Sequence, residues 1–174
     1  MHGLVLVDHK GAVLRNSIIW CDSRAVTIGH KAYEDLGAQK CMNQLLNAPG
    51  NFTASKLKWV KDNEPNVYNA IHKYMLPGDY IAYKLSGTIL TIKNGLSEGI
   101  LWDYKNHTIA DVLLEQYSIA KDLTPTITEN FTLQSKVNAE ASKATGYIQK
   151  GKCPSVLVVD NLLPMSSTIL RLLI

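Results

Sequence analysis

The sequence predicts a single domain of mixed α/β or α+β class, and three observations support this. First, the chain has 174 residues, of which 46% are hydrophobic, which fits one globular domain of roughly 100–200 residues. Second, strand-like runs rich in Val, Ile and Leu stand at the start and near the end of the chain. Third, segments with helix-capping residues separate these runs, at spacings too wide for a regular βαβ array.

The apolar and turn residues predict four strands. They cover residues 3–7, 12–20, 88–92 and 154–160. The first two form a β-hairpin, because the turn residues Asp-His-Lys-Gly separate them. The last (PSVLVVD) is a short apolar run of the kind that forms a buried strand.

Six helices are expected, and most have a residue suited to begin or end them. The expected helices cover residues 22–36, 53 to about 63, 65–73, 79–85, 108–117 and 137–146. The candidate N-caps are Asp22 or Ser23, Thr53, Asp79 and Thr108, and the candidate stops are Gly37, Gly87 and Gly146. Pro65 either ends the second helix or begins the third, because proline fits the first turn of a helix and not its interior.

Composition and charge exclude several classes of function. The net charge is +3 from 18 basic and 15 acidic residues, and the basic residues are scattered, so we expect no nucleic-acid partner. No apolar stretch approaches the roughly 20 residues of a membrane span, and the first residues lack the features of a signal peptide. Cys21, Cys41 and Cys153 form no CxxC pair. We therefore expect reduced thiols, which pack as small hydrophobic side chains, and a cytoplasmic location.

Four stretches carry a further signal in their order and spacing. They are MHG at residues 1–3 with WCDSR at 20–24, GNFTASKLKWV with NEP at 50–65, LPGDY with KLSG at 76–87, and SEGILWD at 97–103. Together they resemble the xylulokinases, sugar kinases of the FGGY carbohydrate-kinase family, over residues 1 to about 150. Asn51 departs from the family signature, which has Gly, Ser or an aromatic residue at that position.

The resemblance implies an α/β fold of the ribonuclease H-like, actin-like ATPase type. In this family the N-terminal domain binds the sugar and the C-terminal domain carries most of the ATP site. A xylulokinase transfers the γ-phosphate of Mg-ATP to the 5-hydroxyl of D-xylulose in pentose catabolism. We therefore expect residues 1–160 to be a partial sugar-binding domain for D-xylulose or a related ketose, and residues 161–174 to be an unmatched tail. ATP and Mg²⁺ would bind mostly outside this chain, and a homodimer is one expected assembly.

Asp160 is the candidate catalytic base that the resemblance implies. It ends the apolar run before Asn161, where family members have a Gly-Gly-Asp-Asn or Gly-Asp-Gln segment after a similar strand. Here Val158 and Val159 replace the glycines, although β-branched valine does not readily allow the close ligand approach that glycine allows. A turn or capping role for Asp160 stays open beside the catalytic one.

Met1, His2, Asp22 and Arg24 are the candidate substrate-binding residues that the resemblance implies. His2 can hydrogen-bond sugar hydroxyls, and Met1 can lie against the carbon edge of the sugar. The alternatives are a disordered terminal residue for His2, and a helix cap with a surface ion pair for Asp22 and Arg24.

The remaining notable side chains favour structural roles. A capping Thr53 and a solvated helical Lys56 are favoured over functional roles, although both lie in the family's signature region. Trp20, Trp59 and Trp102 are expected in the core, because burial is the usual role of tryptophan.

Three functional hypotheses stay open. The leading one is a partial xylulokinase with little or no activity of its own, since the sequence has no G-x-x-x-x-G-K-[ST] phosphate loop. The second is a sugar-binding or assembly module without catalysis, and the third is a nonfunctional gene fragment.

Overall fold

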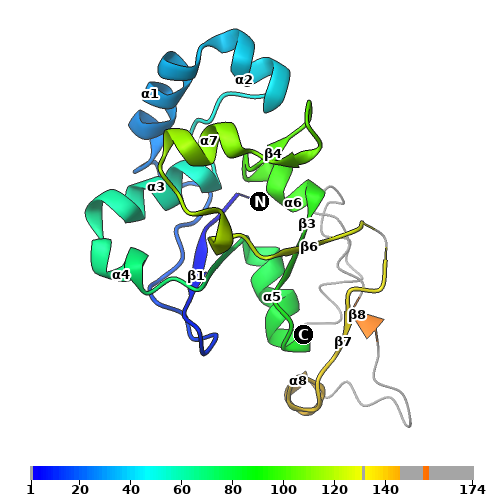
Figure 1. Cartoon of the computed structure of the whole chain (residues 1–174). Helices are drawn as coiled ribbons and strands as arrows, with labels where there is room; N and C mark the ends of the chain where they lie inside the picture. Colours follow the sequence, from blue (N-terminus) through cyan, green and yellow to red (C-terminus); the bar gives the residue numbers. More distant parts are fainter. Residues whose placement is uncertain (1, 131, 146–154, 157–174) are drawn as a thin grey trace.

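The computed structural model describes residues 2–130, 132–145 and 155–156. Its helices are α1 (Val26–Leu36), α2 (Ala38–Gln44), α3 (Thr53–Asn63), α4 (Pro65–Asn69), α5 (Pro77–Ser86), α6 (Lys93–Glu98), α7 (Asp111–Gln116), α8 (Ala139–Thr145) and the short 3-10 helix η1 (Lys121–Leu123). Its strands are β1 (Val5–Val7), β2 (Lys73–Met75), β3 (Leu90–Ile92), β4 (Trp102–Asp103), β5 (Thr108–Ile109), β6 (Thr126–Thr128), β7 (Ser135–Lys136) and β8 (Ser155–Val156). Figure 1 shows α1 and α2 at one end of the molecule and α5 and α8 at the other, with α3 packed against α1.

The described strands pair two by two. β1 runs antiparallel to β2, with Leu6 opposite Tyr74, whereas β3 and β6 run parallel. The pairs β4–β5 and β7–β8 are antiparallel. All three residues of β1 are buried. Burial of both faces explains why this strand has a continuous apolar sequence rather than an alternating one.

The hairpin expected from residues 3–7 and 12–20 forms only in part. Isolated bridges join Leu4 to Ile18 and Val7 to Val13, while the regular ladder of β1 is made with β2. The sequence does not predict strand β2, and its first residue, Lys73, falls at the end of the helix expected over residues 65–73. That helix, α4, ends at Asn69, so its predicted C-terminal part is wrong.

Proline and glycine place several helix ends as expected. α3 ends at Asn63, and Pro65 begins α4 as a residue of its first turn. Gly37 is the C-cap of α1. Gly87 ends α5 with a left-handed φ of 78°, a conformation that glycine adopts without the steric cost of a Cβ atom.

The expected N-caps are wrong at four helices. α5 begins at Pro77 with Leu76 at the N-cap position, so Asp79 is the third residue of the helix and not its cap. α1 begins at Val26 after Ala25 and has no side-chain cap, so neither Asp22 nor Ser23 caps it. Thr53 is the first residue of α3 rather than its cap, and Thr108 lies in β5, ahead of α7. Asp22, Thr53 and Thr108 each take part in a contact with another segment, with Asn51, Gly3 and Asp103 respectively, which the local sequence does not reveal.

Other expectations have mixed outcomes. The expected strand at 88–92 contains β3, and the expected helix at 137–146 contains α8, whereas the short helices α2 and α6 were not expected. The expected strand at 154–160 is described only as β8, which pairs with β7. Gly146, the domain boundary at residue 160 and the tail at 161–174 lie outside the described residues.

The main core lies between α1, α3, α7 and the strand β1. Leu6, Leu57, Val60 and Leu113 are at most 1% exposed. The first turns of α3 enter this core so deeply that its polar residues are buried with the apolar ones. Within the part of the chain that the structure describes, none of the helices is long and apolar enough to cross a bilayer.

Candidate functional site

Two segments from the first 22 residues of the chain meet at the start of α3, which is remote from both in sequence. One is the stretch from His2 to Leu4, and the other runs from Ile18 to Asp22. The backbones of Leu4 and Ile18 exchange hydrogen bonds of 2.9 and 3.0 Å. Gly3 permits the close approach, because a Cβ atom there would lie 2.8 Å from Pro77 Cγ and 3.3 Å from the carbonyl oxygen of Ile18.

Lys56 joins the two segments from inside the protein. Its side chain is 0% exposed, and its Nζ donates hydrogen bonds to the carbonyl oxygens of His2 at 3.2 Å and Ile19 at 2.9 Å. Burial lowers the pKa of this ammonium group, while the charge of Asp22 acts in the opposite direction. The expectation of a solvated Lys56 is therefore wrong.

Thr53 is also part of this junction. It is 0% exposed, and its hydroxyl donates a 3.3 Å hydrogen bond to the carbonyl oxygen of Gly3. The backbone N–H of Ala54 is bonded to the carbonyl oxygen of Gly99. In the first turn of α3, the Thr53 hydroxyl and the Ala54 N–H are therefore satisfied by other segments of the chain rather than by a local cap.

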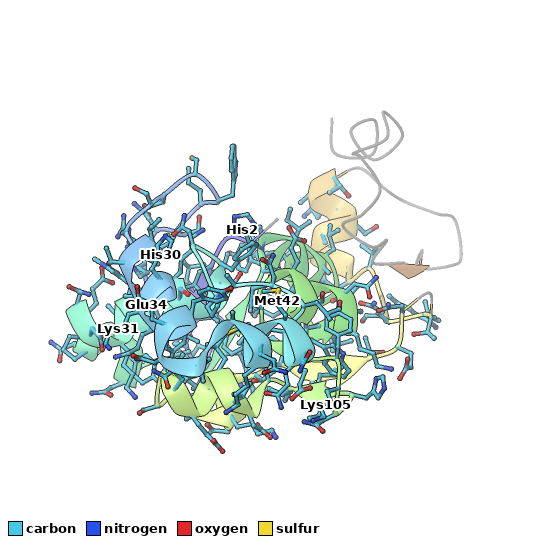
Figure 2. The ribbon with its side chains drawn as sticks, turned by 90° about the horizontal axis from the view of Figure 1, so that it is seen from above. His2, His30, Lys31, Glu34, Met42 and Lys105 are labelled. Atoms are coloured by element: carbon cyan, nitrogen blue, oxygen red, sulfur yellow. The ribbon has the colours of Figure 1, made fainter. Side chains whose placement is uncertain are left out.

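His2 is partly buried and its ring packs against Phe52, with 4.6 Å between the ring centroids. Burial lowers the pKa of His2, and the charge of Lys56 lowers it further, while Glu98 and the Trp20 backbone raise it. A lowered pKa favours the neutral imidazole near pH 7, which can both donate and accept a hydrogen bond. Seen from above in Figure 2, His2 lies near the middle of the molecule, whereas Lys31 and Lys105 lie at its periphery.

Asp22 and Arg24 form a bidentate ion pair. Nε of Arg24 donates to Oδ1 of Asp22 at 2.9 Å, and its NH2 group donates to Oδ2 at 2.7 Å. The hydrogen bond from Arg24 is the largest cause that lowers the pKa of Asp22 to about 2. The guanidinium group also lies 4.5 Å from the ring centroid of Trp59. Both carboxylate oxygens of Asp22 are thus already engaged by Arg24.

The three tryptophans differ sharply in burial. Trp102 is 7% exposed, as expected of a core residue, and Trp59 is partly buried under Arg24. Trp20 is 58% exposed, and its neighbour Ile19 is 53% exposed, so the expectation of a core role for Trp20 is wrong. Its exposed indole stands at the junction that Lys56 holds together.

The structure therefore brings together three of the predicted site residues, His2, Asp22 and Arg24, in the neighbourhood of Lys56. Met1 and Asp160 lie outside the described residues. Sequence reasoning gave too little weight to Lys56 and Trp20. The available signal for Lys56 was its place in the T-x-x-K-x-x-W segment, and the segment W-x-D-x-R contained Trp20 beside two residues already proposed.

A hollow and the distribution of possible metal ligands were compared with this junction. A surface hollow of ≈ 480 Å³ between α2 and α7 is lined by residues that include Lys40, Asp103 and Glu115, and by none of the predicted site residues. Among residues 2–130, 132–145 and 155–156, no three His, Cys, Asp or Glu side chains lie together so as to hold a metal ion.

Comparison with known sequences identifies relatives of the chain. A profile of the N-terminal domain of the FGGY family of carbohydrate kinases matches residues 1–156. The xylulose kinase of Staphylococcus xylosus is 31% identical over 151 residues, which are 84% of this chain and 30% of that protein. The xylulose kinase of Escherichia coli is 30% identical over 147 residues, again 84% of this chain and 30% of that protein.

Comparison with solved structures agrees. A kinase from Brucella ovis described as a xyloylose kinase superposes with a TM-score of 0.79 at 25% identity, covering 91% of this chain and 32% of that one. The xylulose kinase of Rhodospirillum rubrum gives 0.75 at 28% identity, with 86% and 30% covered. These matches confirm the predicted resemblance and the actin-like ATPase fold class. The chain spans about 30% of the length of the curated relatives that it matches.

Proposed function

The chain belongs to the FGGY family of carbohydrate kinases, and we propose that it forms part of the sugar site of a xylulokinase-like enzyme. The ligand would be D-xylulose or a related ketose. The observation that carries this proposal is the junction at Lys56. Lys56 binds the backbone of His2 and that of Ile19, the neighbour of the exposed Trp20, and the His2 imidazole is hydrogen-bonded to the Trp20 backbone. An imidazole can bond sugar hydroxyls, and an indole offers a flat apolar face to the C–H groups of a sugar.

The roles of the other predicted residues follow from their contacts. Asp22 is saturated by Arg24, so we propose that the pair acts as a unit, with the Arg24 N–H groups that do not face Asp22 as donors to the sugar. Asp160 stays our proposed general base on the family resemblance, and Met1 a proposed contact. In the proposed reaction the 5-hydroxyl oxygen would form a bond to the phosphorus of the γ-phosphate as the bond from that phosphorus to the β,γ-bridging oxygen breaks, so that ADP leaves, and Asp160 would take the hydroxyl proton.

ATP and Mg²⁺ would supply the phosphoryl group and stabilise its charge in such an enzyme. Among the described residues, no three His, Cys, Asp or Glu side chains lie together so as to hold a metal ion. We therefore assign no residue of the chain as a contact of either one. A cytoplasmic location stays part of the proposal.

Sugar binding by the purified chain tests the proposal. Calorimetric titration should give a saturable signal with D-xylulose, a weaker one with D-ribulose, and none with glycerol at the same concentrations. A folded chain that binds none of the three would overturn the proposal. Sugar binding without phosphate transfer after addition of Mg-ATP would support the alternative of a non-catalytic sugar-binding module. If turnover is seen, Asp160→Asn should lower kcat by about 10²–10⁴-fold with little change in KM.

A further inference from the structure

We propose that Lys56 is a positioning residue, whose ammonium group fixes the backbone at His2 and Ile19 and so sets where the His2 imidazole and the Trp20 indole stand. The link to sugar binding rests on the proposed function. The positioning itself does not, because it concerns only contacts within the chain.

The backbone pairing of the two segments stops just short of these side chains. Leu4 and Ile18 form a bridge through two backbone hydrogen bonds. The carbonyl groups near this bridge, on the side toward the His2 and Trp20 rings, are those that Lys56 binds, at 3.2 Å for His2 and 2.9 Å for Ile19. Lys56 thus extends the connection between the segments beyond the point where backbone pairing ends.

Packing alone does not account for a lysine at this position. The side chain is 0% exposed, and the ion pairs within the described part of the chain do not include it. A buried ammonium group without a carboxylate at ion-pair distance carries a desolvation cost that an apolar residue of similar length would avoid. In return for this cost, lysine at position 56 makes two directed hydrogen bonds, which an apolar residue could not make.

Lys56 acts through its neighbours rather than on a ligand. Because it has no exposed surface, a sugar in solution cannot reach it. Its removal would leave the His2 and Ile19 carbonyl groups without this donor and free the ends of both segments. The His2 ring, held against Phe52, and the exposed Trp20 ring would then lose their fixed separation.

Three variants separate positioning from packing. Lys56→Met keeps the length and removes the donors, whereas Lys56→Arg keeps a cation with donors. Lys58→Met is the matched control, because Lys58 lies on the same helix with 26% of its side chain exposed and pairs with Asp62. The readouts are the NMR signals and pKa of the His2 imidazole and the affinity for D-xylulose.

For Lys56→Met we expect the His2 signals to move, its pKa to rise, and the affinity to fall about 10–100-fold, the loss that a small misplacement causes. Lys56→Arg should recover much of this loss, and Lys58→Met should stay within about twofold of the unmodified chain. A packing role predicts the opposite order, with methionine tolerated at least as well as the bulkier arginine. That order, or unmoved His2 signals in Lys56→Met, overturns the proposal.

Two further outcomes also decide the proposal. If Lys56→Met does not fold, the unmodified chain decides: its Lys56 ammonium should give a solvent-protected ¹⁵N signal with couplings to the carbonyl carbons of His2 and Ile19. Absence of those couplings overturns the proposal. If the His2 signals move in Lys56→Met while no form of the chain binds sugar, Lys56 positions His2 and the proposed sugar function fails.

Discussion

The hydroxyl group of Thr91 donates a 2.9 Å hydrogen bond to the carboxylate of Asp79 inside the core. The backbone N–H of Leu76 reaches the same oxygen at 3.4 Å, so Asp79 closes the first turn of α5 from its third residue. Burial is the largest cause that raises the pKa of Asp79 from 3.8 to about 6, against the effect of these two hydrogen bonds. The folded chain therefore holds a proton at Asp79 at pH values where the unfolded chain has released it.

This difference predicts a pH dependence of stability. A raised pKa in the folded state stabilises the fold below the unfolded value of 3.8, and this stabilisation is lost as pH rises through about 6. In Asp79→Asn the group no longer titrates. The free energy of unfolding of the unmodified chain should therefore fall, relative to the variant, on the order of 2 kcal/mol between about pH 4 and pH 7. Urea unfolding across this range measures it, and parallel curves for the two chains would contradict it.

Gly29 allows α1 to touch the loop before α3. A Cβ atom at Gly29 would lie 1.9 Å from the carbonyl oxygen of Gly50, so Gly29→Ala must push the two backbones apart. We expect a loss of about 1–3 kcal/mol or more, as in other overpacked sites. Gly95→Ala is the control, since its nearest neighbour would be Thr91 Oγ1 at 3.4 Å, and it should be neutral or stabilising by up to about 1 kcal/mol. Thermal unfolding of both variants checks the order.

Replacing Trp20 by alanine should affect stability far less than replacing Trp102. Trp20 is 58% exposed, so Trp20→Ala should change stability by less than about 0.5 kcal/mol while weakening D-xylulose binding. Trp102 is 7% exposed, and Trp102→Ala should cost about 3–5 kcal/mol. The prediction fails if Trp20→Ala destabilises the chain as much as Trp102→Ala does.

The Asp22–Arg24 ion pair should contribute little to stability. With 23% of the Asp22 side chain and 33% of the Arg24 side chain exposed, a double-mutant cycle of Asp22→Asn and Arg24→Gln should give a coupling of at most about 1 kcal/mol. Because the pKa of Asp22 is lowered to about 2, the coupling should be complete above the unfolded value of 3.8 and decline as pH falls toward 2. A coupling that persists unchanged at low pH would exclude Asp22 as its source.

Local chemistry made part of this fold predictable. Pro65 and Gly87 mark their helix boundaries because their effect on φ depends on the residue itself. Strand β2 (Lys73–Met75) could not be predicted in the same way, because three residues show no periodicity and the partner strand is remote in sequence. Thr53 and Thr108 look like N-caps, yet tertiary contacts and a strand pairing determine their actual conformations.

The candidate site was predictable in composition more than in arrangement. The resemblance singled out His2, Asp22 and Arg24, but no periodicity could show that Asp22 and Arg24 form two hydrogen bonds with each other. Lysine and tryptophan were assigned by their usual environments, and both assumptions failed here: Lys56 is buried and Trp20 is exposed. Such reversals arise from the assembled fold, which brings carbonyl groups from two distant segments to one ammonium group.

The pairing of β1 with β2 also has a consequence for biosynthesis. Val5–Val7 finds its ladder partner only at Lys73–Met75, so this apolar strand leaves the ribosome well before its partner exists. At about 5–20 residues per second the wait lasts several seconds, far longer than the microseconds in which a local hairpin closes. The bridge between Val7 and Val13 can form early in this interval. We expect this bridge to cover part of the apolar strand until β2 has been synthesised. The incomplete hairpin would then contribute to folding as well as to the folded structure.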